Sequence, residues 1–176
     1  MATDHGAHGH QHHQPHTSED EHRLAAKVLT VSDGVIAGTR EDRSGEALGE
    51  TLAAAGYEVV ERRVVADGID TVSEALAEMS TGFEGLIVST GGTGFTERDL
   101  TPEGTRAAIE REAPGLAEAM RLVNPLGRLS RGVAGIIGRT IVLNTPGSTK
   151  GCVECFEAVA DVLPHALALL AGERLH

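Results

Sequence analysis

The amino-acid sequence predicts an α/β fold in which helices pack against a mostly parallel sheet. From Ala25 onward, short apolar runs alternate with segments whose apolar residues recur at helical spacing. No apolar run reaches the ~18 residues that a membrane-spanning helix needs. The chain of 176 residues is long enough to bury the core of one domain.

Four short segments are candidates for strands. In sequence order they are residues 27–32, 58–65, 85–90 and 140–143. Segments of helical period alternate with these runs, which is the pattern of a parallel sheet covered by helices.

Helices are predicted between the first three strands. Leu48, Leu52 and Ala55 recur at helical spacing, and Gly56 is well placed to end that helix. The next helix carries an apolar stripe formed by Val72, Ala75, Leu76 and Met79.

Two further helical segments follow the third strand. Thr101 is predicted as an N-cap, Pro102 as the first helical residue and Glu103 as an acid favoured by the helix dipole. Near the end of the chain a long apolar stripe runs from residue 153 to residue 170. Pro164 lies within this stripe and is predicted to interrupt the helix.

The first 22 residues differ from the rest of the chain. They hold seven of the nine histidines and almost no apolar side chains, so we predict a disordered His-rich tail over residues 1–22 and a folded domain over residues 23–176. The spacing of His10, His12 and His13 suits a weak transition-metal site, which would make metal handling a function of the tail. A solubilising or artificial extension explains the same composition.

The charge of the chain argues against a nucleic-acid partner. Proteins that bind a long polyanion normally neutralise its phosphates with a basic stripe, whereas this chain has a formal charge of -11. Residues 1–22 hold four acidic side chains and no lysine or arginine, so residues 23–176 keep a charge of -7. The N-terminus lacks the pattern of a secretion signal, and we expect a cytoplasmic protein without a membrane partner.

A glycine-rich loop follows the third predicted strand, at the edge where open parallel sheets bind ligands. The glycines of Gly91-Gly92-Thr93-Gly94 would let consecutive amides converge on a phosphate or another oxyanion. A tight strand-to-helix turn explains the same residues. Neither this loop nor the later Gly147–Gly151 segment fits the dinucleotide-binding or P-loop motif, so both of those sites are disfavoured.

Asp67 and Asp99 follow two different strands and are expected at the same edge of the sheet. Carboxylate oxygens are hard ligands, and this pair could hold Mg²⁺ against substrate phosphates. Taken alone, each aspartate is better explained by an ordinary structural role, because Asp-Gly is a common turn dipeptide and Asp99 could merely lead into a helix. Asp33, in another Asp-Gly turn, is a weaker candidate.

Three later features have both a functional and a structural interpretation. Ser130-Arg131 and Lys150 could bind a phosphate or the edge of a heterocycle, or could lie in surface turns. Cys152 and Cys155 form a CxxC segment, but the folded domain has no further ligand pair to complete a zinc site. We predict two reduced thiols, at least one of them buried, rather than a thioredoxin-type redox motif.

Together these segments resemble the MoaB/Mog family of molybdopterin-binding proteins. The resemblance is carried by Ser89–Glu103 (STGGTGFTERDLTPE), Leu29–Leu48, Leu129–Gly151 and the turn at Asp67. It covers residues 25–172 and leaves the His-rich tail outside. It implies a three-layer α/β/α domain that assembles as a homotrimer or hexamer.

The resemblance also implies an activity. Family members that act in molybdenum cofactor biosynthesis adenylylate molybdopterin, with ATP as co-substrate and Mg²⁺ as cofactor, and release diphosphate. Asp67 and Asp99 match the two catalytic aspartates and would hold Mg²⁺. The implied molybdopterin-binding and phosphate-binding residues are Thr90, Gly91, Gly92, Thr93, Gly94, Ser130, Arg131, Pro146, Gly147 and Ser148. A MoaB-branch protein that binds molybdopterin without catalysis is the alternative.

Overall fold

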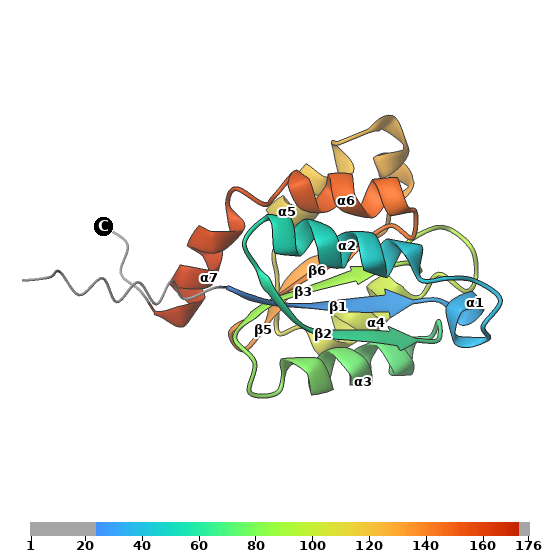
Figure 1. The fold of residues 1–176 in the computed structure, drawn as a ribbon, viewed down its shortest axis with the longest axis horizontal. Coiled ribbons are helices and arrows are strands. Elements are labelled where there is room, and N and C mark those ends of the chain that lie inside the picture. The colour runs from blue at the N-terminus through green and yellow to red at the C-terminus, as the bar shows by residue number, and fades with distance from the viewer. Residues whose placement is uncertain (1–23, 173–176) are drawn as a thin grey trace, which may run out of the picture.

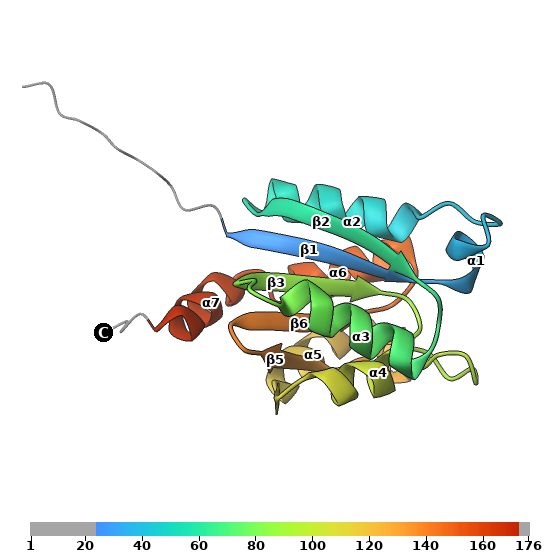
Figure 2. The ribbon, with the colours of Figure 1, turned by 90° about the horizontal axis from the view of Figure 1, so that it is seen from below.

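A six-stranded sheet with the order β2-β1-β3-β6-β5-β4 lies at the centre of the computed structural model, which describes residues 24–172. Its four parallel strands are β1 (Ala25–Val31), β2 (Glu58–Val65), β3 (Gly85–Thr90) and β6 (Thr140–Thr145). Two strands with antiparallel pairing extend the sheet beyond β6, namely β5 (Ala134–Ile137) and β4 (Arg111–Glu112). Figure 2 shows β5 beside β6 at this end of the sheet.

The four predicted strands are all present, and only their ends differ. β1 begins at Ala25, and β6 continues to Thr145 because its pairing with β3 extends that far. The sequence pattern does not predict β5 or β4. β5 has four residues, one of them a glycine, and β4 has two charged residues, so their pairing depends on tertiary context.

Helices cover both faces of the sheet, which confirms the three-layer fold (Figure 1). One face carries α2 (Arg43–Ala54), α5 (Pro114–Arg121) and α6 (Thr149–Glu157), whereas α3 (Ile69–Ser80) and α4 (Thr101–Ala108) pack together on the other. The remaining helical segments are α1 (Asp33–Ile36), the 3-10 helix η1 (Pro125–Leu129) and α7 (Leu163–Ala171).

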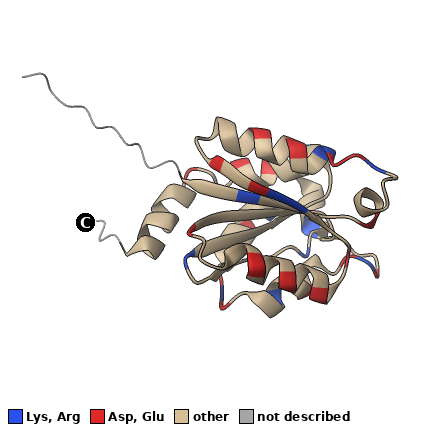
Figure 3. Ribbon diagram, turned by 60° about the horizontal axis from the view of Figure 1, so that its bottom comes forward, with Lys and Arg blue, Asp and Glu red and all other residues tan. Residues whose placement is uncertain are grey.

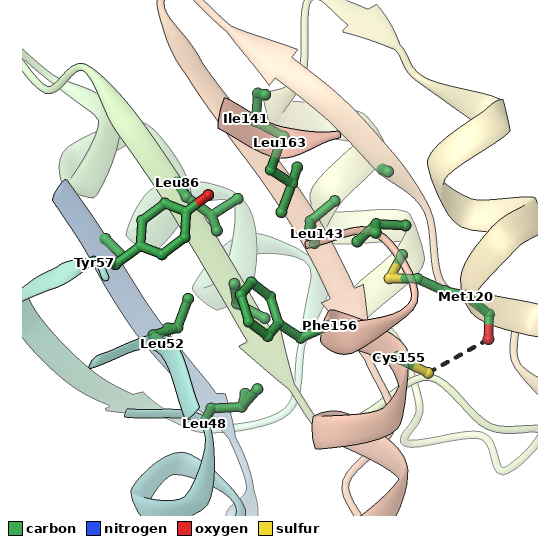
Figure 4. Close-up of a cluster of buried hydrophobic side chains, with 14 of the residues drawn as sticks. Leu48, Leu52, Tyr57, Leu86, Met120, Ile141, Leu143, Cys155, Phe156 and Leu163 are labelled. Atoms are coloured by element: carbon green, nitrogen blue, oxygen red, sulfur yellow. Dashed lines mark hydrogen bonds between the residues drawn. The ribbon is translucent and has the colours of Figure 1, made fainter. Parts of the chain in front are cut away.

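Alternation along the central strands gives each helical layer its own apolar core. Val28 of β1 lies in the cluster under α2, α5 and α6, while the next residue, Leu29, lies in the cluster under α3. Figure 4 shows Phe156 of α6 inside the first cluster. Its ring meets that of Tyr57 edge to face, with 6.2 Å between the centroids. The apolar faces of both layers are therefore anchored on the central strands.

Two predicted helix boundaries differ from the structure. Thr101 does not cap α4. It is the first residue of that helix, and its hydroxyl donates to the Gly91 carbonyl at 2.9 Å. The last apolar stripe forms two helices, as the interruption at Pro164 predicts, but the chain leaves α6 before the proline. Pro164 lies in the first turn of α7, where a missing N–H costs nothing.

β1 and β3 lie side by side, yet the helices that follow them, α2 and α4, cover opposite faces of the sheet. This arrangement is the topological switch point at which open α/β sheets bind their ligands. The loops after β1, β2, β3 and β6 therefore come together at one edge, on the right in Figure 1.

Two sequence predictions concern features away from the sheet. The His-rich tail over residues 1–22, with its candidate metal ligands, lies outside the described residues. Among the helices of residues 24–172, none combines the length and the apolar composition needed to cross a membrane.

Candidate functional site

A cavity of about 1080 Å³ opens at the carboxyl edge of the parallel strands. Residues of the loops after β1, β2, β3 and β6 line it, together with residues of α5, η1 and α6. The predicted site residues that line it are Asp67, Thr90, Gly91, Gly92, Thr93, Gly94, Asp99, Ser130, Pro146, Gly147 and Ser148. Among the described site residues that the family resemblance implies, Arg131 alone does not line it, and the weaker candidate Asp33 does not line it either.

Two glycines of the loop after β3 adopt backbone conformations that other residues rarely reach. Gly91 has a φ of 99° and Gly92 a φ of 64°. A Cβ at Gly91 would overlap the Val31 carbonyl at the end of β1, and a Cβ at Gly92 would overlap the Thr101 hydroxyl. The loop therefore turns in a narrow space between β1 and α4 that only glycine fits.

The fold uses one amide of this loop and leaves three without a partner among the described residues. The Gly91 N–H donates to the Thr145 carbonyl of β6 at 3.2 Å. Within the described part of the chain, no acceptor meets the amides of Gly92, Thr93 and Gly94. These three amides could hold an anion, whereas the Gly91 amide is already used by the sheet.

Asp67 follows β2 and is held by the loop after β1. The Asp33 N–H donates to Asp67 Oδ2 at 3.0 Å, and the Asp67 N–H donates to Asp33 Oδ1 at 3.1 Å. Burial raises the pKa of Asp67, and the negative charges of Asp33 and Asp99 raise it further against the opposing effects of the Asp33 amide and Arg98. A cation near Asp67 would favour the charged form of this carboxyl group.

Asp99 lies on the other side of the same glycine loop. Its Oδ2 accepts a hydrogen bond from the Thr96 N–H at 2.8 Å. A Cβ at Gly94 would lie 2.8 Å from Asp99 Oδ2, and one at Gly92 would lie 3.0 Å from Asp67 Oδ1, so the two carboxylates flank the loop. Within residues 24–172, Oδ1 of each aspartate accepts no hydrogen bond. Each carboxylate thus keeps one oxygen for a ligand.

The two carboxylates could hold a hard divalent cation only together with other ligands. Among residues 24–172, no group of three or more His, Cys, Asp or Glu side chains is placed to hold a metal ion. Mg²⁺ commonly takes one or two protein carboxylates and completes its shell with substrate phosphates and water. The donor set fits such a shared site, and it does not fit a closed zinc site.

Arg131 is bound within the protein rather than at the cavity wall. Its Nε donates to the Gly94 carbonyl at 2.8 Å, its Nη2 donates to the Asp99 carbonyl, and its Nη1 pairs with Glu103 at 2.5 Å. The guanidinium holds the pKa of Glu103 below its usual range. Arg131 thus shapes the loop between Gly94 and Asp99, and its contact with a phosphate stays a prediction.

The segment from β6 into α6 forms another part of the wall. Thr90 Oγ1 at the end of β3 donates to the Pro146 carbonyl at 2.9 Å, which joins this segment to the glycine loop. Ser148 Oγ caps α6 by accepting the Gly151 N–H at 3.2 Å. The Lys150 ammonium lies 3.6 Å from Glu154. The Lys150 side chain is 86% exposed, so the ammonium is free to turn toward a ligand.

Residues of α5 and η1 form a further part of the wall. Ala117 and Met120 of α5 and Leu126 and Leu129 of η1 give this wall an apolar surface. Leu126 is 74% exposed, a large value for a leucine. Apolar surface in the same cavity as a polar loop suits a planar heterocycle. The 3-10 helix η1 is too short for a periodic signal. The sequence does carry one for α5, because Ala113, Leu116, Ala117 and Met120 recur at helical spacing and Pro114 lies in the first turn.

The cavity is nearly balanced in charge although the chain is acidic. Four acidic and four basic residues line it, namely Glu41, Asp67, Asp99, Glu154, Arg40, Arg43, Arg121 and Lys150. Figure 3 shows acidic residues on helices of both outer layers, and those of α2 and α3 are exposed. The acidic excess of the described residues therefore lies outside the cavity and does not oppose a small anion there.

Cys152 and Cys155 are buried free thiols, as the sequence predicts. Cys152 Sγ donates to the Thr149 carbonyl at 3.2 Å, and Cys155 Sγ donates to the Met120 carbonyl at 3.6 Å (Figure 4). Burial raises the pKa of each thiol to about 11. Neither thiol has the thiolate character that a redox motif or a nucleophile needs.

Because both thiols are buried, we expect them to react slowly with a thiol reagent. At about pH 8, only about one thiol in a thousand is a thiolate when the pKa is near 11, so we expect dithionitrobenzoate to label neither Cys152 nor Cys155 within minutes. Absorbance of the released thionitrobenzoate measures the reaction. Denaturation in guanidinium chloride should make both thiols react at once, and rapid labelling of the folded chain would contradict their burial.

Comparison with protein families matches residues 27–165 to the family described as a probable molybdopterin binding domain. Among curated proteins, a molybdopterin adenylyltransferase of Helicobacter pylori strain J99 is 37% identical over 152 residues, which cover 82% of this chain and 86% of that protein. The molybdenum cofactor synthesis protein cinnamon of Drosophila melanogaster is 38% identical over 155 residues, or 83% of this chain. This chain spans only 25% of the length of cinnamon.

A solved structure has the same fold. The crystal structure of the molybdopterin biosynthesis enzyme MoaB from Thermus thermophilus superposes with a TM-score of 0.79 and 45% sequence identity. The match covers 87% of this chain and 99% of that one. The similarity therefore extends over most of the fold of this chain.

Proposed function

This chain belongs to the MoaB/Mog family of molybdopterin-binding proteins, and from that premise we propose that it acts in molybdenum cofactor biosynthesis as a molybdopterin adenylyltransferase. The phosphate of molybdopterin would attack the α-phosphorus of ATP. A bond would form between an oxygen of the molybdopterin phosphate and the α-phosphorus. The bond between the α-phosphorus and the oxygen that bridges it to the β-phosphorus would break, and diphosphate would leave. The products are adenylyl-molybdopterin and diphosphate.

One observation carries the proposal: Asp67 and Asp99, from loops after different strands, flank the glycine loop, and each keeps one carboxylate oxygen for a ligand. Transfer between phosphates requires alignment and neutralisation of charge more than covalent help from the protein. A pair of carboxylates beside a loop with three amides unpaired within residues 24–172 suits this requirement, because the amides would meet one phosphate and the carboxylates would hold a cation for the other.

We propose that Asp67 and Asp99 hold Mg²⁺ through their Oδ1 atoms, since hard oxygen ligands suit this ion. When bound, Mg²⁺ supplies positive charge to the phosphate oxygens of ATP. The amides of Gly92, Thr93 and Gly94 would hold the phosphate of molybdopterin, and the apolar wall with Leu126 would cover a ring.

Two further features support a direct transfer between two bound substrates. The cavity of about 1080 Å³ exceeds the ~300–1,000 Å³ typical of a site for one small molecule. The two thiols are buried with pKa values raised to about 11, so neither offers itself as an intermediate acceptor of the adenylyl group.

We also propose assembly as a homotrimer or hexamer, which light scattering of the purified chain would test.

The experiment is an assay of the purified full chain with molybdopterin, ATP and Mg²⁺. We expect adenylyl-molybdopterin and diphosphate in equal amounts, detected by mass spectrometry and by a coupled diphosphate assay. Omitting Mg²⁺ and adding a chelator should stop both products. A chain that binds molybdopterin but forms no product under these conditions would contradict catalysis and support the binding-only alternative.

A further inference from the structure

The ion pair between Arg98 and Asp33 joins the loops that carry the two candidate metal ligands. Arg98 precedes Asp99 in the loop after β3, while Asp33 follows β1. Arg98 Nη2 lies 2.5 Å and Arg98 Nε 3.1 Å from Asp33 Oδ2, so the guanidinium holds this oxygen with two donors. Arg98 Nη2 also lies 3.5 Å from the Asp67 carbonyl. One side chain thus connects three loops.

Asp33 in turn fixes Asp67. The backbone N–H of each of these aspartates donates to the carboxylate of the other, at 3.0 Å and 3.1 Å. Asp33 therefore uses one oxygen for the Asp67 amide and the other for Arg98. The path from Asp67 through Asp33 and Arg98 to Asp99 is continuous, with no step longer than an ordinary hydrogen bond or one peptide unit.

We propose that Asp33 and Arg98 are positioning residues that hold the Asp67 and Asp99 carboxylates at the separation a divalent cation needs. This inference rests on the proposed function, because it concerns the same metal site. Neither residue lines the cavity, so neither is placed to contact a substrate. Replacing groups that orient metal ligands typically weakens metal binding by about 10- to 100-fold.

Because the ion pair between Arg98 and Asp33 lies at the surface, its effect on metal binding can be measured without a large effect on folding. The Arg98 side chain is 66% exposed and the Asp33 side chain 47%, and ion pairs this exposed contribute little to folding. We therefore expect variants of this pair to fold normally. A matched control exists at the opposite edge of the sheet, where Arg139 and Glu84 form an ion pair of 2.7 Å with side chains 55% and 58% exposed.

Positioning and simple charge repulsion predict opposite results for Arg98→Ala. Removing a cation near a metal site strengthens metal binding if the cation only repels the metal. Removing a group that fixes the ligands weakens it. The direction of the change in metal affinity therefore decides between the two roles.

The experiment titrates the full chain with Mn²⁺ alone and follows binding by water proton relaxation. We expect Arg98→Ala and Asp33→Asn to weaken Mn²⁺ binding by about 10- to 100-fold, and Arg98→Lys to recover part of the loss. Arg139→Ala should bind like the unchanged chain, and all four variants should keep its midpoint of thermal unfolding. Unchanged or tighter Mn²⁺ binding by Arg98→Ala would overturn the proposal, as would the absence of Mn²⁺ binding by the unchanged chain.

Kinetics provide a second test, which separates this inference from the proposed function. We expect Arg98→Ala to lower kcat for adenylylation while the KM for molybdopterin stays the same. If the unchanged chain makes no product but its Mn²⁺ affinity depends on Arg98, the proposed activity fails and the positioning role stands. If the unchanged chain is active and Arg98→Ala matches it in both Mn²⁺ affinity and kcat, the positioning role fails and the activity stands.

Discussion

Replacing Asp67 with asparagine is expected to lower the rate of molybdopterin adenylylation by about 10²- to 10³-fold, the size of effect seen when one preorganised electrostatic group is removed from an active site. Asparagine has the same shape and can accept the Asp33 N–H, but its neutral amide is a poor ligand for Mg²⁺. The affinity for molybdopterin should stay the same, because the glycine-loop amides are unchanged.

The same substitution should not destabilise the fold. Burial raises the pKa of Asp67, so the folded protein disfavours the charged carboxylate, and a neutral amide relieves that cost. Thermal unfolding measures this, and the diphosphate assay measures the rate. Asp70→Asn is the control, because Asp70 is an exposed acid in the first turn of α3. Equal rates for Asp67→Asn and Asp70→Asn would contradict a catalytic role for Asp67.

Gly91→Ala should cause the largest loss of stability among single changes in the site. We expect a loss of about 3 kcal/mol, of which about 1 kcal/mol comes from placing alanine at positive φ and the rest from the overlap of its Cβ with the Val31 carbonyl. For a domain of this size, the midpoint of thermal unfolding should fall by roughly 6–12 °C.

Gly38 provides the control for this prediction. It also has a positive φ, 70°, but a Cβ there would meet no atom within 4 Å. Gly38→Ala should therefore lose only the roughly 1 kcal/mol that positive φ costs an alanine. If both variants unfold at the same temperature, the close approach of the glycine loop to β1 does not limit the residue at position 91.

The strands β3 and β6 follow from local pattern because burial decides them, whereas β2 has no buried residue and carries its signal in two pairs of valines. All six residues of β3 are buried, and a continuous apolar run predicts that directly. β5 has no such signal, because its glycine at position 135 lies against Ile109 and the Arg111 carbonyl of neighbouring segments. Its pairing depends on contacts between residues that are distant in sequence.

Of the candidate site, the sequence could predict only the residues that follow a predicted strand directly. The glycine loop and both aspartates follow from that rule, whereas the contacts of Asp33, Arg98 and Arg131 do not. Arg98 and Asp33 are 65 positions apart, and their bond depends on β1 and β3 being neighbours in the sheet. The sequence of a turn dipeptide such as Asp33-Gly34 therefore looks the same whether its carboxylate binds a residue of the site, as Asp33 binds the Asp67 amide, or only solvent.

The place of β6 in the sheet bears on how the protein is made. β6 is the last strand to leave the ribosome, yet it inserts between β3 and β5. Until residue 145 has been synthesised, β3 is an uncovered apolar edge of the kind that promotes aggregation. The loop after β6 also supplies Gly147 and Ser148 to the cavity wall. A nascent chain therefore completes its sheet and its cavity in the same step, and a fragment that ends before β6 would have neither.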